Sequence, residues 1–337
     1  MKAIVQEEYG SPDLLELREI EEPVPGPGEV LVEVRASSVH PDVWHTVRGV
    51  PYALRLMGSG VRRPKRPVPG TDVAGVVASV GEDATRFHVG DEVFGETTRA
   101  NTWRNGGAYA ELAPVHEELL EPKPARLTFE QAAAIPNAGK IAVQGLRDEG
   151  RLRAGQRVLI NGAGGGVGTA SVQIAKAFGA EVTGVDAAEK LDTIRSIGAD
   201  HVLDFAREDF TRGAARYDVI LDIAGNRPFS EVRRALTPDG TYVLIGHDHY
   251  GRYGRHWIGS LGRFLVLLVR SPFVRQLPGL RGAKDPGDRL KVVKELIDAV
   301  KLTPVLDRTF PLAEVPAAIR YLEGENAIGR VVITIGP

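Results

Sequence analysis

Short runs of alternating apolar and polar residues dominate the first 120 positions, which is the pattern of half-buried β-strands. Turn residues separate these runs, most clearly Pro23–Gly28, Pro69–Gly70 and Val89–Asp91. The expected strands are Lys2–Gln6, Glu29–Ala36, Val73–Val80, Glu92–Phe94 and Ala108–Ala113. Many short strands with such punctuation predict a compact, barrel-like β domain.

From Thr128 the apolar residues recur at helical spacing, and farther on strands alternate with helices. This alternation predicts a doubly wound parallel sheet. The expected strands are 158–160, 182–185, 201–204, 219–223, 241–245 and 331–335. The expected helices are 128–134 with Thr128 as N-cap, 142–149, 167–178, 188–197, 230–236, 289–301 and 312–323. The span from Gly246 to Asp288 shows no clear period, so we expect an irregular lid or partner surface there.

The most informative motif lies between the first two strands of this region. Five glycines fall between Gly162 and Gly168, a helix follows, and the second strand ends on Asp186. Glycine permits a sharp turn and lets a pyrophosphate approach the backbone, while the free amides of the helix start attract the anion. The alternative is a flexible glycine loop, but the order strand, glycine turn, helix, strand, acid favours a dinucleotide site.

Asp186 also bears on the choice of cofactor. A carboxylate at this strand end accepts hydrogen bonds from ribose hydroxyls and repels a 2′-phosphate, so we expect NAD(H) to be favoured over NADP(H). Lys190, Arg207 and Arg227 are the counter-evidence, because they could reach a phosphate. The expected cofactor-binding residues are Gly162, Gly165, Gly166, Val167, Gly168, Asp186, Lys190, Ala224, Gly225, Asn226, Ile245, Gly246 and His247.

Bulk properties narrow the class of protein. A length of 337 residues predicts two domains, and 43% apolar with 26% charged residues is an ordinary globular composition. The net charge of −2 argues against nucleic acid or an anionic membrane as a principal partner. No stretch approaches the roughly 20 apolar residues that span a bilayer, and Met1–Val5 lacks the pattern of a secretory signal. We expect a cytoplasmic enzyme.

Two local features qualify this picture. The chain contains no cysteine, which excludes disulfides, thiolate zinc sites and a cysteine nucleophile. Residues Arg62–Pro67 form a short basic run, which we interpret as a solvated loop, with a phosphate contact as the alternative.

Five segments together resemble the medium-chain dehydrogenase/reductase superfamily, and within it the zinc-independent quinone oxidoreductase branch. They are Pro25–Val30, Pro69–Gly75, Val89–Gly95, Asn161–Gly168 and Gly198–Asp200. The resemblance implies an α/β fold. A Rossmann domain with a doubly wound parallel sheet would occupy residues 126–269, and a discontinuous, β-rich GroES-like catalytic domain would occupy 1–125 and 270–337. It also implies a homodimer and a cofactor bound in the cleft.

Zinc needs a separate test, because many members of this superfamily carry it. The positions that match the family's three zinc ligands are His40, Thr71 and Asn137. One strong ligand out of three will not hold zinc tightly, so we expect no metal.

Three residues are candidates for catalysis. Hydride addition to a quinone or an α,β-unsaturated carbonyl leaves an anion that must be stabilised and protonated, and a histidine near neutrality is a natural proton donor. His40 is therefore the first candidate, although the resemblance implies asparagine at this position. Lys140 could instead stabilise the oxyanion. Tyr52 lies where the resemblance implies a substrate-facing aromatic side chain, with simple packing as its alternative role.

Other histidines leave the substrate open. His247, His249 and His256 follow the strand 241–245 and could line the same cleft as His40, or lie on the surface. The leading hypothesis is a zinc-independent, NAD(P)H-dependent reductase of a quinone or an α,β-unsaturated carbonyl compound. The alternatives are a zinc-free alcohol dehydrogenase or carbonyl reductase, and a non-catalytic dinucleotide-binding protein.

Overall fold

The computed structural model describes residues 1–98, 104–246, 256–259, 261–278 and 287–336. The chain divides into two compact units. Unit 1 comprises Met1–Asn137, Gly254–Ile258 and Leu306–Pro337, and unit 2 comprises Ala138–Tyr253 and Gly259–Val305. The chain thus leaves unit 1 and later returns to it.

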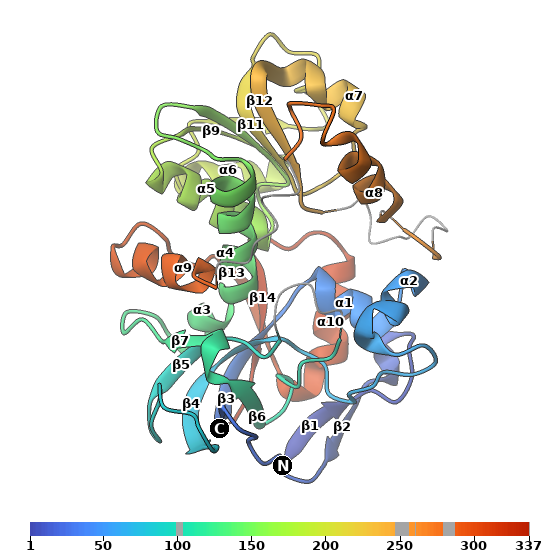
Figure 1. The fold of residues 1–337 in the computed structure, drawn as a ribbon, viewed down its shortest axis with the longest axis vertical. Helices are drawn as coiled ribbons and strands as arrows, with labels where there is room; N and C mark the ends of the chain where they lie inside the picture. The colour runs from blue at the N-terminus through green and yellow to red at the C-terminus, as the bar shows by residue number, and fades with distance from the viewer. Residues whose placement is uncertain (99–103, 247–255, 260, 279–286, 337) are drawn as a thin grey trace. The chain divides into compact units, whose positions relative to one another are not determined.

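Unit 1 is built on a mostly antiparallel sheet (Figure 1). Its strands are β1 Lys2–Val5, β2 Glu16–Glu19, β3 Glu29–Val39, β4 Asp72–Val80, β5 Glu92–Glu96, β6 Leu112–His116, β7 Leu120–Pro122, β13 Leu306–Pro311 and β14 Arg330–Thr334. The main sheet has the order β13-β14-β3-β4-β5-β7, with β6 also paired to β3, while β1 and β2 pair with each other. Strand β14 therefore lies inside the sheet, antiparallel to β3 with Val331 opposite Val39.

Short helices complete unit 1. They are α1 Pro41–Arg48, α2 Tyr52–Leu54, α3 Phe129–Ala133 and α10 Val315–Glu323. Thr128 caps α3 as predicted, because its hydroxyl accepts from the amide of Gln131 while the Gln131 side chain accepts from the amide of Thr128.

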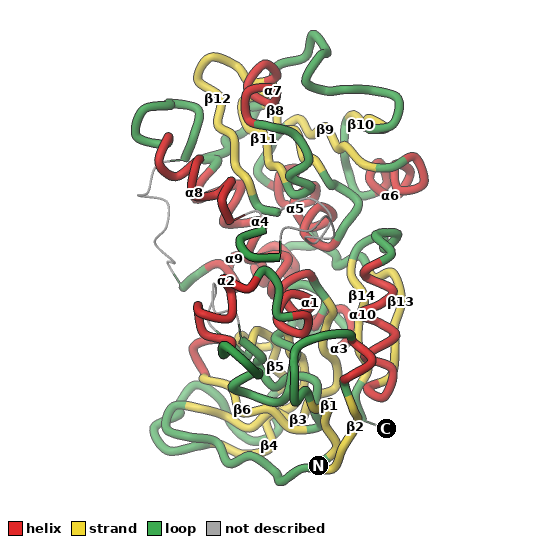
Figure 2. Tube along the Cα trace, turned by 90° about the vertical axis from the view of Figure 1, so that its right-hand side faces the viewer, coloured by secondary structure: helices red, strands yellow, loops and turns green. Residues whose placement is uncertain are grey.

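Unit 2 is a five-stranded parallel sheet with helices between its strands. The strands are β8 Arg157–Asn161, β9 Glu181–Asp186, β10 His201–Asp204, β11 Tyr217–Asp222 and β12 Leu236–Leu244, in the order β10-β9-β8-β11-β12. Figure 2 shows β10 and β12 at opposite edges of this sheet. The helices are α4 Pro136–Val143, which begins at the boundary of the units, α5 Gly166–Ala177, α6 Leu191–Ser196, α7 Phe229–Val232, α8 Leu261–Arg270 and α9 Arg289–Asp298.

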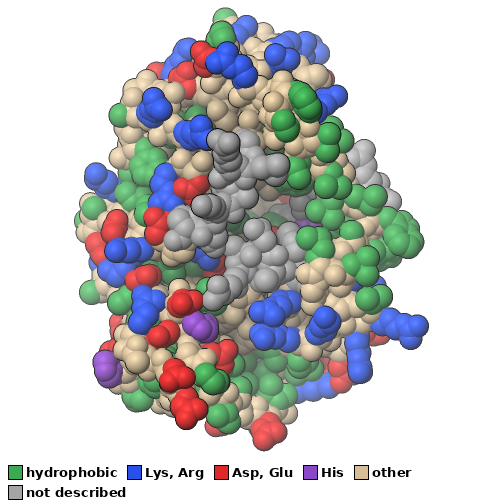
Figure 3. All heavy atoms as spheres, in the orientation of Figure 1, with side chains coloured by type: hydrophobic (Ala, Val, Ile, Leu, Met, Phe, Trp, Pro, Cys, Tyr) green, Lys and Arg blue, Asp and Glu red, His purple; other side chains and the backbone are tan. Residues whose placement is uncertain are grey.

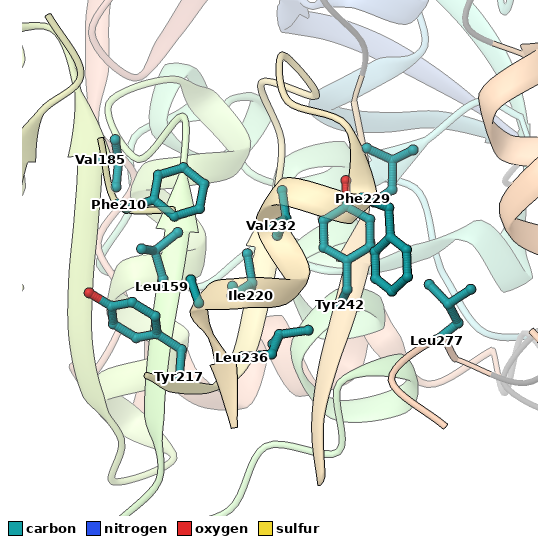
Figure 4. Close-up of a cluster of buried hydrophobic side chains, with 12 residues drawn as sticks. Leu159, Val185, Phe210, Tyr217, Ile220, Phe229, Val232, Leu236, Tyr242 and Leu277 are labelled. Carbon is teal, nitrogen blue, oxygen red and sulfur yellow. The ribbon is translucent and has the colours of Figure 1, made fainter. Parts of the chain in front are cut away.

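One apolar cluster fills the side of this sheet near β11 and β12 (Figure 4). It includes Leu159, Ile220, Tyr242 and Leu277, which are all buried. Phe264 and Leu267 of α8 pack against the cluster, and the two lie three residues apart on one face of the helix. Helix α8 is therefore attached to unit 2 through one side only.

The predicted fold class is confirmed, and several local predictions are not. Strands β2, β7 and β13 were not expected, and α8 forms within a span that we expected to be irregular. Strand β6 begins at Leu112, four residues after Ala108, where we expected it to begin.

We expected the chain to return to the first domain near residue 270, but unit 2 extends to Val305. Ion pairs explain the position of α9. Arg289 bonds to Asp148, and Asp288 accepts two hydrogen bonds from Arg147 at 3.0 and 2.8 Å.

Candidate active site

The glycine turn of unit 2 has the geometry of an anion site. Gly162 follows β8 with φ 91°, a conformation that favours glycine, and Gly165 directly precedes the 12-residue helix α5. At Gly168, an added Cβ would lie 2.1 Å from the carbonyl oxygen of Gly162, so helix and turn approach too closely for a side chain. At Gly165, an added Cβ would meet nothing within 4 Å. The helix start is therefore open to a pyrophosphate.

Asp186 lies at the end of β9, as predicted, beside this turn. Its carboxylate accepts from the amide of Gly164 at 2.7 Å and from its neighbour Ala187 at 2.9 Å. The ammonium nitrogen of Lys190 lies 3.8 Å from Oδ1 of Asp186. A carboxylate offers about four acceptor positions, so Asp186 retains capacity for ribose hydroxyls. In this position the Lys190 ammonium could also contact the 2′-phosphate of NADP(H).

A buried network holds the turn after β11, and sequence reasoning did not find it. Asp222 is fully buried and accepts from Asn161 at 2.8 Å, from the amide of Gly225 at 2.9 Å and from the Tyr242 hydroxyl at 2.7 Å. Burial and the nearby Asp222 carboxylate raise the pKa of Tyr242, so its hydroxyl remains a donor. The network fixes the predicted cofactor residues Ala224, Gly225 and Asn226 at the strand end.

The next strand end reinforces this arrangement. The amide of Ile245 donates to the carbonyl of Asp222 at 2.9 Å, and an added Cβ on Gly246 would lie 1.8 Å from the carbonyl oxygen of Ile223. The predicted residues Gly162, Val167, Ala224 and Ile245 thus follow strands that are neighbours in one parallel sheet. His247 and His249 lie outside the described residues.

His40 lies in unit 1 at the residue before α1, and only 1% of it is exposed. Its Nε2 atom lies 2.8 Å from Oγ1 of Thr71. Its Nδ1 atom is buried without a hydrogen-bond partner among the described residues, 3.8 Å from a carboxylate oxygen of Asp42. An unpartnered buried polar atom is costly, so a group bound in the functioning enzyme is a natural partner.

Behind His40 lies a group of buried charges that the sequence analysis missed. Asp72 is fully buried, accepts from the Ser38 hydroxyl, and accepts from the amide of Asn137 at 3.0 Å. Arg330, at the start of β14 and 4% exposed, donates to the side-chain oxygen of Asn137 at 3.3 Å. The buried Glu96 accepts from the other side of Asn137 at 3.4 Å. We name Asp72, Glu96, Asn137 and Arg330 the buried charge cluster.

Burial and one of these charges set the protonation state of His40. Burial, and then the positive charge of Arg330, hold the pKa of His40 well below its usual value of 6.5. The imidazole is therefore neutral at pH 7, which differs from our expectation of a histidine that titrates near neutrality. Burial raises the pKa of Asp72 to about 7, against the opposing influence of Arg330.

The three positions that match the family's zinc ligands do not form a good metal site. His40 and Thr71 are brought together, but Thr71 and Asn137 offer only neutral oxygen atoms. The side-chain oxygen of Asn137 accepts from Arg330, whose positive charge disfavours a cation there. Within the described ranges, no group of three His, Cys, Asp or Glu side chains could hold a metal ion.

The structure places the other two catalytic candidates, Tyr52 and Lys140, on separate helices. Tyr52, in α2, stacks on His256 with ring centroids 6.3 Å apart and meets the edge of Trp257 at 5.5 Å. Its ring is also 4.6 Å from the guanidinium of Arg55. Lys140 lies in the last turn of α4, partly exposed, and belongs to unit 2. His40 and Thr71 are thus the candidate pair that the structure brings into contact.

Comparisons with known proteins agree with this description. Residues 26–125 match the alcohol dehydrogenase GroES-like domain, and residues 197–333 match the zinc-binding dehydrogenase family. The human quinone oxidoreductase is 32% identical over 99% of this chain and 98% of its own length. The NADPH-dependent alkenal/one oxidoreductase of Arabidopsis thaliana chloroplasts is 32% identical over 99% of this chain and 79% of its own length. The quinone oxidoreductase of Coxiella burnetii has the same fold, with a TM-score of 0.83 over the whole chain at 24% identity.

The fold, the glycine turn and these relatives define a nicotinamide-dependent oxidoreductase. More narrowly, the chain belongs to the medium-chain dehydrogenase/reductase superfamily, in its quinone oxidoreductase-like branch.

Proposed function

We propose that this enzyme transfers a hydride from a reduced nicotinamide dinucleotide to a quinone or to the β-carbon of an α,β-unsaturated carbonyl compound, without zinc. The observation that carries the proposal is the buried, neutral His40, which is bonded to Thr71 and keeps an unpartnered Nδ1 atom. Two relatives that match nearly the whole chain are named for quinone and alkenal/one substrates, which supports the same chemistry.

Unit 2 supplies the binding residues. The open backbone at Gly165 and the start of α5 hold the pyrophosphate, and Asp186 holds the adenosine ribose. When bound, the reduced cofactor supplies the hydride, and the protein supplies orientation and electrostatics. We propose that NAD(H) is favoured over NADP(H), because the backbone fixes Asp186 at the strand end, while the Lys190 side chain lies over Gly164 and is the competing cation.

Unit 1 supplies the side chains that stabilise the negative charge that develops on the substrate. A substrate that gains a hydride becomes an enolate or a hydroquinone anion. Neutral His40 is a hydrogen-bond donor from Nδ1 when Thr71 donates to Nε2, and this arrangement stabilises an oxyanion. Because the pKa of His40 is low, the imidazole donates a hydrogen bond rather than a full proton, and water delivers the proton. Tyr52 is proposed as a wall of the substrate site. Lys140, which belongs to unit 2, is proposed as a second stabilising group.

Zinc independence has a direct test. Activity is expected to survive dialysis against a chelator, and the purified protein is expected to contain no stoichiometric zinc. The weak donor set at His40, Thr71 and Asn137 is the reason. One tightly bound zinc ion per chain, whose removal abolishes activity, would contradict this part of the proposal.

The substrate class is tested with a panel of quinones, enones, aldehydes and secondary alcohols, each assayed with both nicotinamide cofactors. Turnover of quinones or enones with NADH is the expected result. Steady oxidation of secondary alcohols alone would establish an alcohol dehydrogenase, and NADH binding without any turnover would establish a non-catalytic binding protein. Either result would overturn the proposal.

We further propose that the enzyme is a cytoplasmic homodimer. The resemblance of nearly the whole chain to this branch supports the dimer. In the described part of the chain, no helix has the length and apolar character needed to cross a membrane. Light scattering of the purified protein and fractionation of cells that express it test these two points.

A further inference from the structure

Helix α8 contacts the rest of unit 2 through the polar side chain of Arg263 as well as through its apolar side. Phe264 and Leu267 pack against the apolar cluster, and the side chain of Arg263 is only 26% exposed. Leu265 and Val269 lie on the outer side of the helix and are exposed. Figure 3 shows hydrophobic side chains gathered on the side of unit 2 where Figure 1 places α8. Arg263 is therefore a polar anchor for a helix that is attached on one side only.

Arg263 holds the backbone of the turn that follows β11. Its guanidinium donates hydrogen bonds to two carbonyl oxygens, from Nη1 to Gly225 and from Nη2 to Arg227. The guanidinium is a planar, rigid fork of donors, so one side chain can fix two carbonyl groups at once. Gly225 itself has φ 60°, in the left-handed region that favours glycine. We name residues 224–227 the β11 turn; a residue of α8 holds it.

The same guanidinium also joins the buried network behind the β11 turn. Nη2 of Arg263 donates to the Tyr242 hydroxyl at 3.1 Å, and this hydroxyl donates to Asp222 at 2.7 Å. The guanidinium lies 3.9 Å from the Asp222 carboxylate, which is fully buried, so the two charges offset each other. Asp222 in turn accepts from the amide of Gly225 at 2.9 Å. Arg263 thus acts on the turn directly through two carbonyls and indirectly through Tyr242 and Asp222.

The order of the strands places the β11 turn on one side of the proposed cofactor site. In the order β10-β9-β8-β11-β12, the glycine turn follows the central strand β8. Asp186 ends β9 on one side of β8, and Gly225 follows β11 on the other side. A dinucleotide binds across the carboxyl ends of such strands. If the pyrophosphate lies at the glycine turn and the adenosine ribose at Asp186, the nicotinamide half lies on the side of Gly225.

We propose that Arg263 is a positioning residue for the nicotinamide half of the cofactor, because it fixes the β11 turn from α8. A side chain that only anchored the helix would need no more than the charge of Asp222. The bonds to the carbonyls of Gly225 and Arg227 act on the turn itself. Affinity for the complete dinucleotide then depends on the docking of α8, whereas affinity for the adenosine half does not. This inference rests on the proposed placement of the cofactor, and it is independent of the substrate.

Binding measurements on the full-length protein test the inference, with NADH and ADP as probes. NADH spans both halves of the site, whereas ADP lacks the nicotinamide and its ribose. Arg263→Met removes the fork of donors and leaves a long side chain in its place. We expect this variant to bind NADH about tenfold more weakly than the parent and to bind ADP with unchanged affinity. Isothermal titration calorimetry measures both affinities.

Two further variants accompany this measurement. Arg270→Met is the matched control, because Arg270 is an exposed arginine in the last turn of the same helix, and neither affinity should change. Arg263→Lys keeps a positive charge beside Asp222 but replaces the planar fork by a single ammonium group. We expect it to weaken NADH binding about threefold and to leave ADP binding unchanged. If Arg263→Met does not fold, Arg263→Lys is judged by the same criteria.

Two outcomes would overturn the inference. Unchanged NADH affinity would show that the β11 turn does not need Arg263. An equal loss of affinity for NADH and ADP would show that Arg263 supports unit 2 as a whole. Gly165→Ala separates these outcomes from a failure of the proposed cofactor site, since its methyl group should weaken both probes. If Gly165→Ala weakens neither, the cofactor binds elsewhere, and the proposed site and this inference fail together.

Discussion

Nε2 of His40 and Oγ1 of Thr71 lie 2.8 Å apart, although they occupy two of the positions that hold zinc in related enzymes. This contact fixes which imidazole nitrogen of His40 faces Thr71. Burial, and then the positive charge of Arg330, hold the pKa of this histidine well below its usual value, so it resembles a neutral hydrogen-bond donor more closely than a titrating acid.

Turnover is expected to depend on this histidine. His40→Ala should lower kcat by about 10²-fold, the range seen for a positioned acid or hydrogen-bond donor. Cofactor affinity should change little, because His40 belongs to unit 1 and the glycine turn to unit 2. Steady-state kinetics and NADH fluorescence measure the two quantities. His88→Ala, at a fully solvated histidine, is the control, and unchanged kcat in His40→Ala would exclude the assigned role.

The same residue should make the fold sensitive to acid. The folded-state pKa of His40 lies below the unfolded value of 6.5, so below pH 6.5 the unfolded chain binds a proton that the folded chain does not. Stability is therefore lost as pH falls through this window, by up to about 1.4 kcal/mol per pH unit. Urea unfolding of the parent protein and of His40→Asn near pH 7 and pH 5 measures the effect.

The parent is expected to lose more stability than His40→Asn between these two pH values. Asp72 contributes with the opposite sign, because its raised pKa of about 7 favours the folded state as pH falls. That contribution is present in both proteins and largely cancels in their difference. An identical loss in the two proteins would show that His40 does not titrate as described.

Arg330 is expected to be essential for stability. Arg330→Met leaves Asp72 and Glu96 buried without a compensating charge, and breaking such an arrangement costs about 3–5 kcal/mol. Arg330→Lys keeps the charge and should cost less. Arg35→Met, which removes a partly exposed ion pair with Glu33, should cost about 0–1 kcal/mol. Denaturant unfolding measures all three, and a loss for Arg330→Met as small as that for Arg35→Met would contradict this account.

Two glycines of the same turn should respond differently to one methyl group. Gly168→Ala places a Cβ 2.1 Å from a backbone oxygen, so the protein should lose about 1–3 kcal/mol of stability. Gly165→Ala meets no protein atom within 4 Å, so its melting temperature should be unchanged. Its methyl group would instead occupy the space of the pyrophosphate, and NADH affinity should fall about tenfold, or about 1.4 kcal/mol. Normal NADH affinity in Gly165→Ala would move the phosphate site elsewhere.

Cofactor choice should follow Asp186. The parent enzyme is expected to have the higher kcat/KM with NADH. Asp186→Ser should shift the ratio toward NADPH by about tenfold, because the repulsive carboxylate is gone and Lys190 remains. Asp192→Ser, at an exposed acid on α6, should leave the ratio unchanged. A parent enzyme that prefers NADPH would show that Lys190 outweighs the carboxylate.

Secondary structure was predicted most accurately from the sequence where a short segment carries its own clear pattern. The strand, glycine turn and helix from β8 to β9 were predicted to within a few residues, since each part carries its own signal over a short span. Strand β2 was missed because all four of its residues are exposed and none marks a core face. Helix α8 was missed because six consecutive apolar residues, 264–269, obscure a helical period.

The site was predicted only in part for a different reason. His40 and the glycines belong to recognisable segments. Arg330 and Asp72 are each the first residue of a largely apolar strand, β14 and β4. Only the pairing of β14 with β3, and of β3 with β4, brings these two residues into one cluster. A single sequence contains no signal that links residues so far apart along the chain.

The position of β14 also orders events during synthesis on the ribosome. Unit 2 is encoded between two parts of unit 1, and all of its residues have been made by Val305. The sheet of unit 1 lacks an inner strand, and Asp72 lacks its countercharge, until Arg330–Thr334 have left the exit tunnel. Unit 2 can therefore mature early, whereas unit 1, which carries His40, waits for residues 330–334. If the proposed sites are correct, a nascent chain would complete the cofactor site before the site around His40.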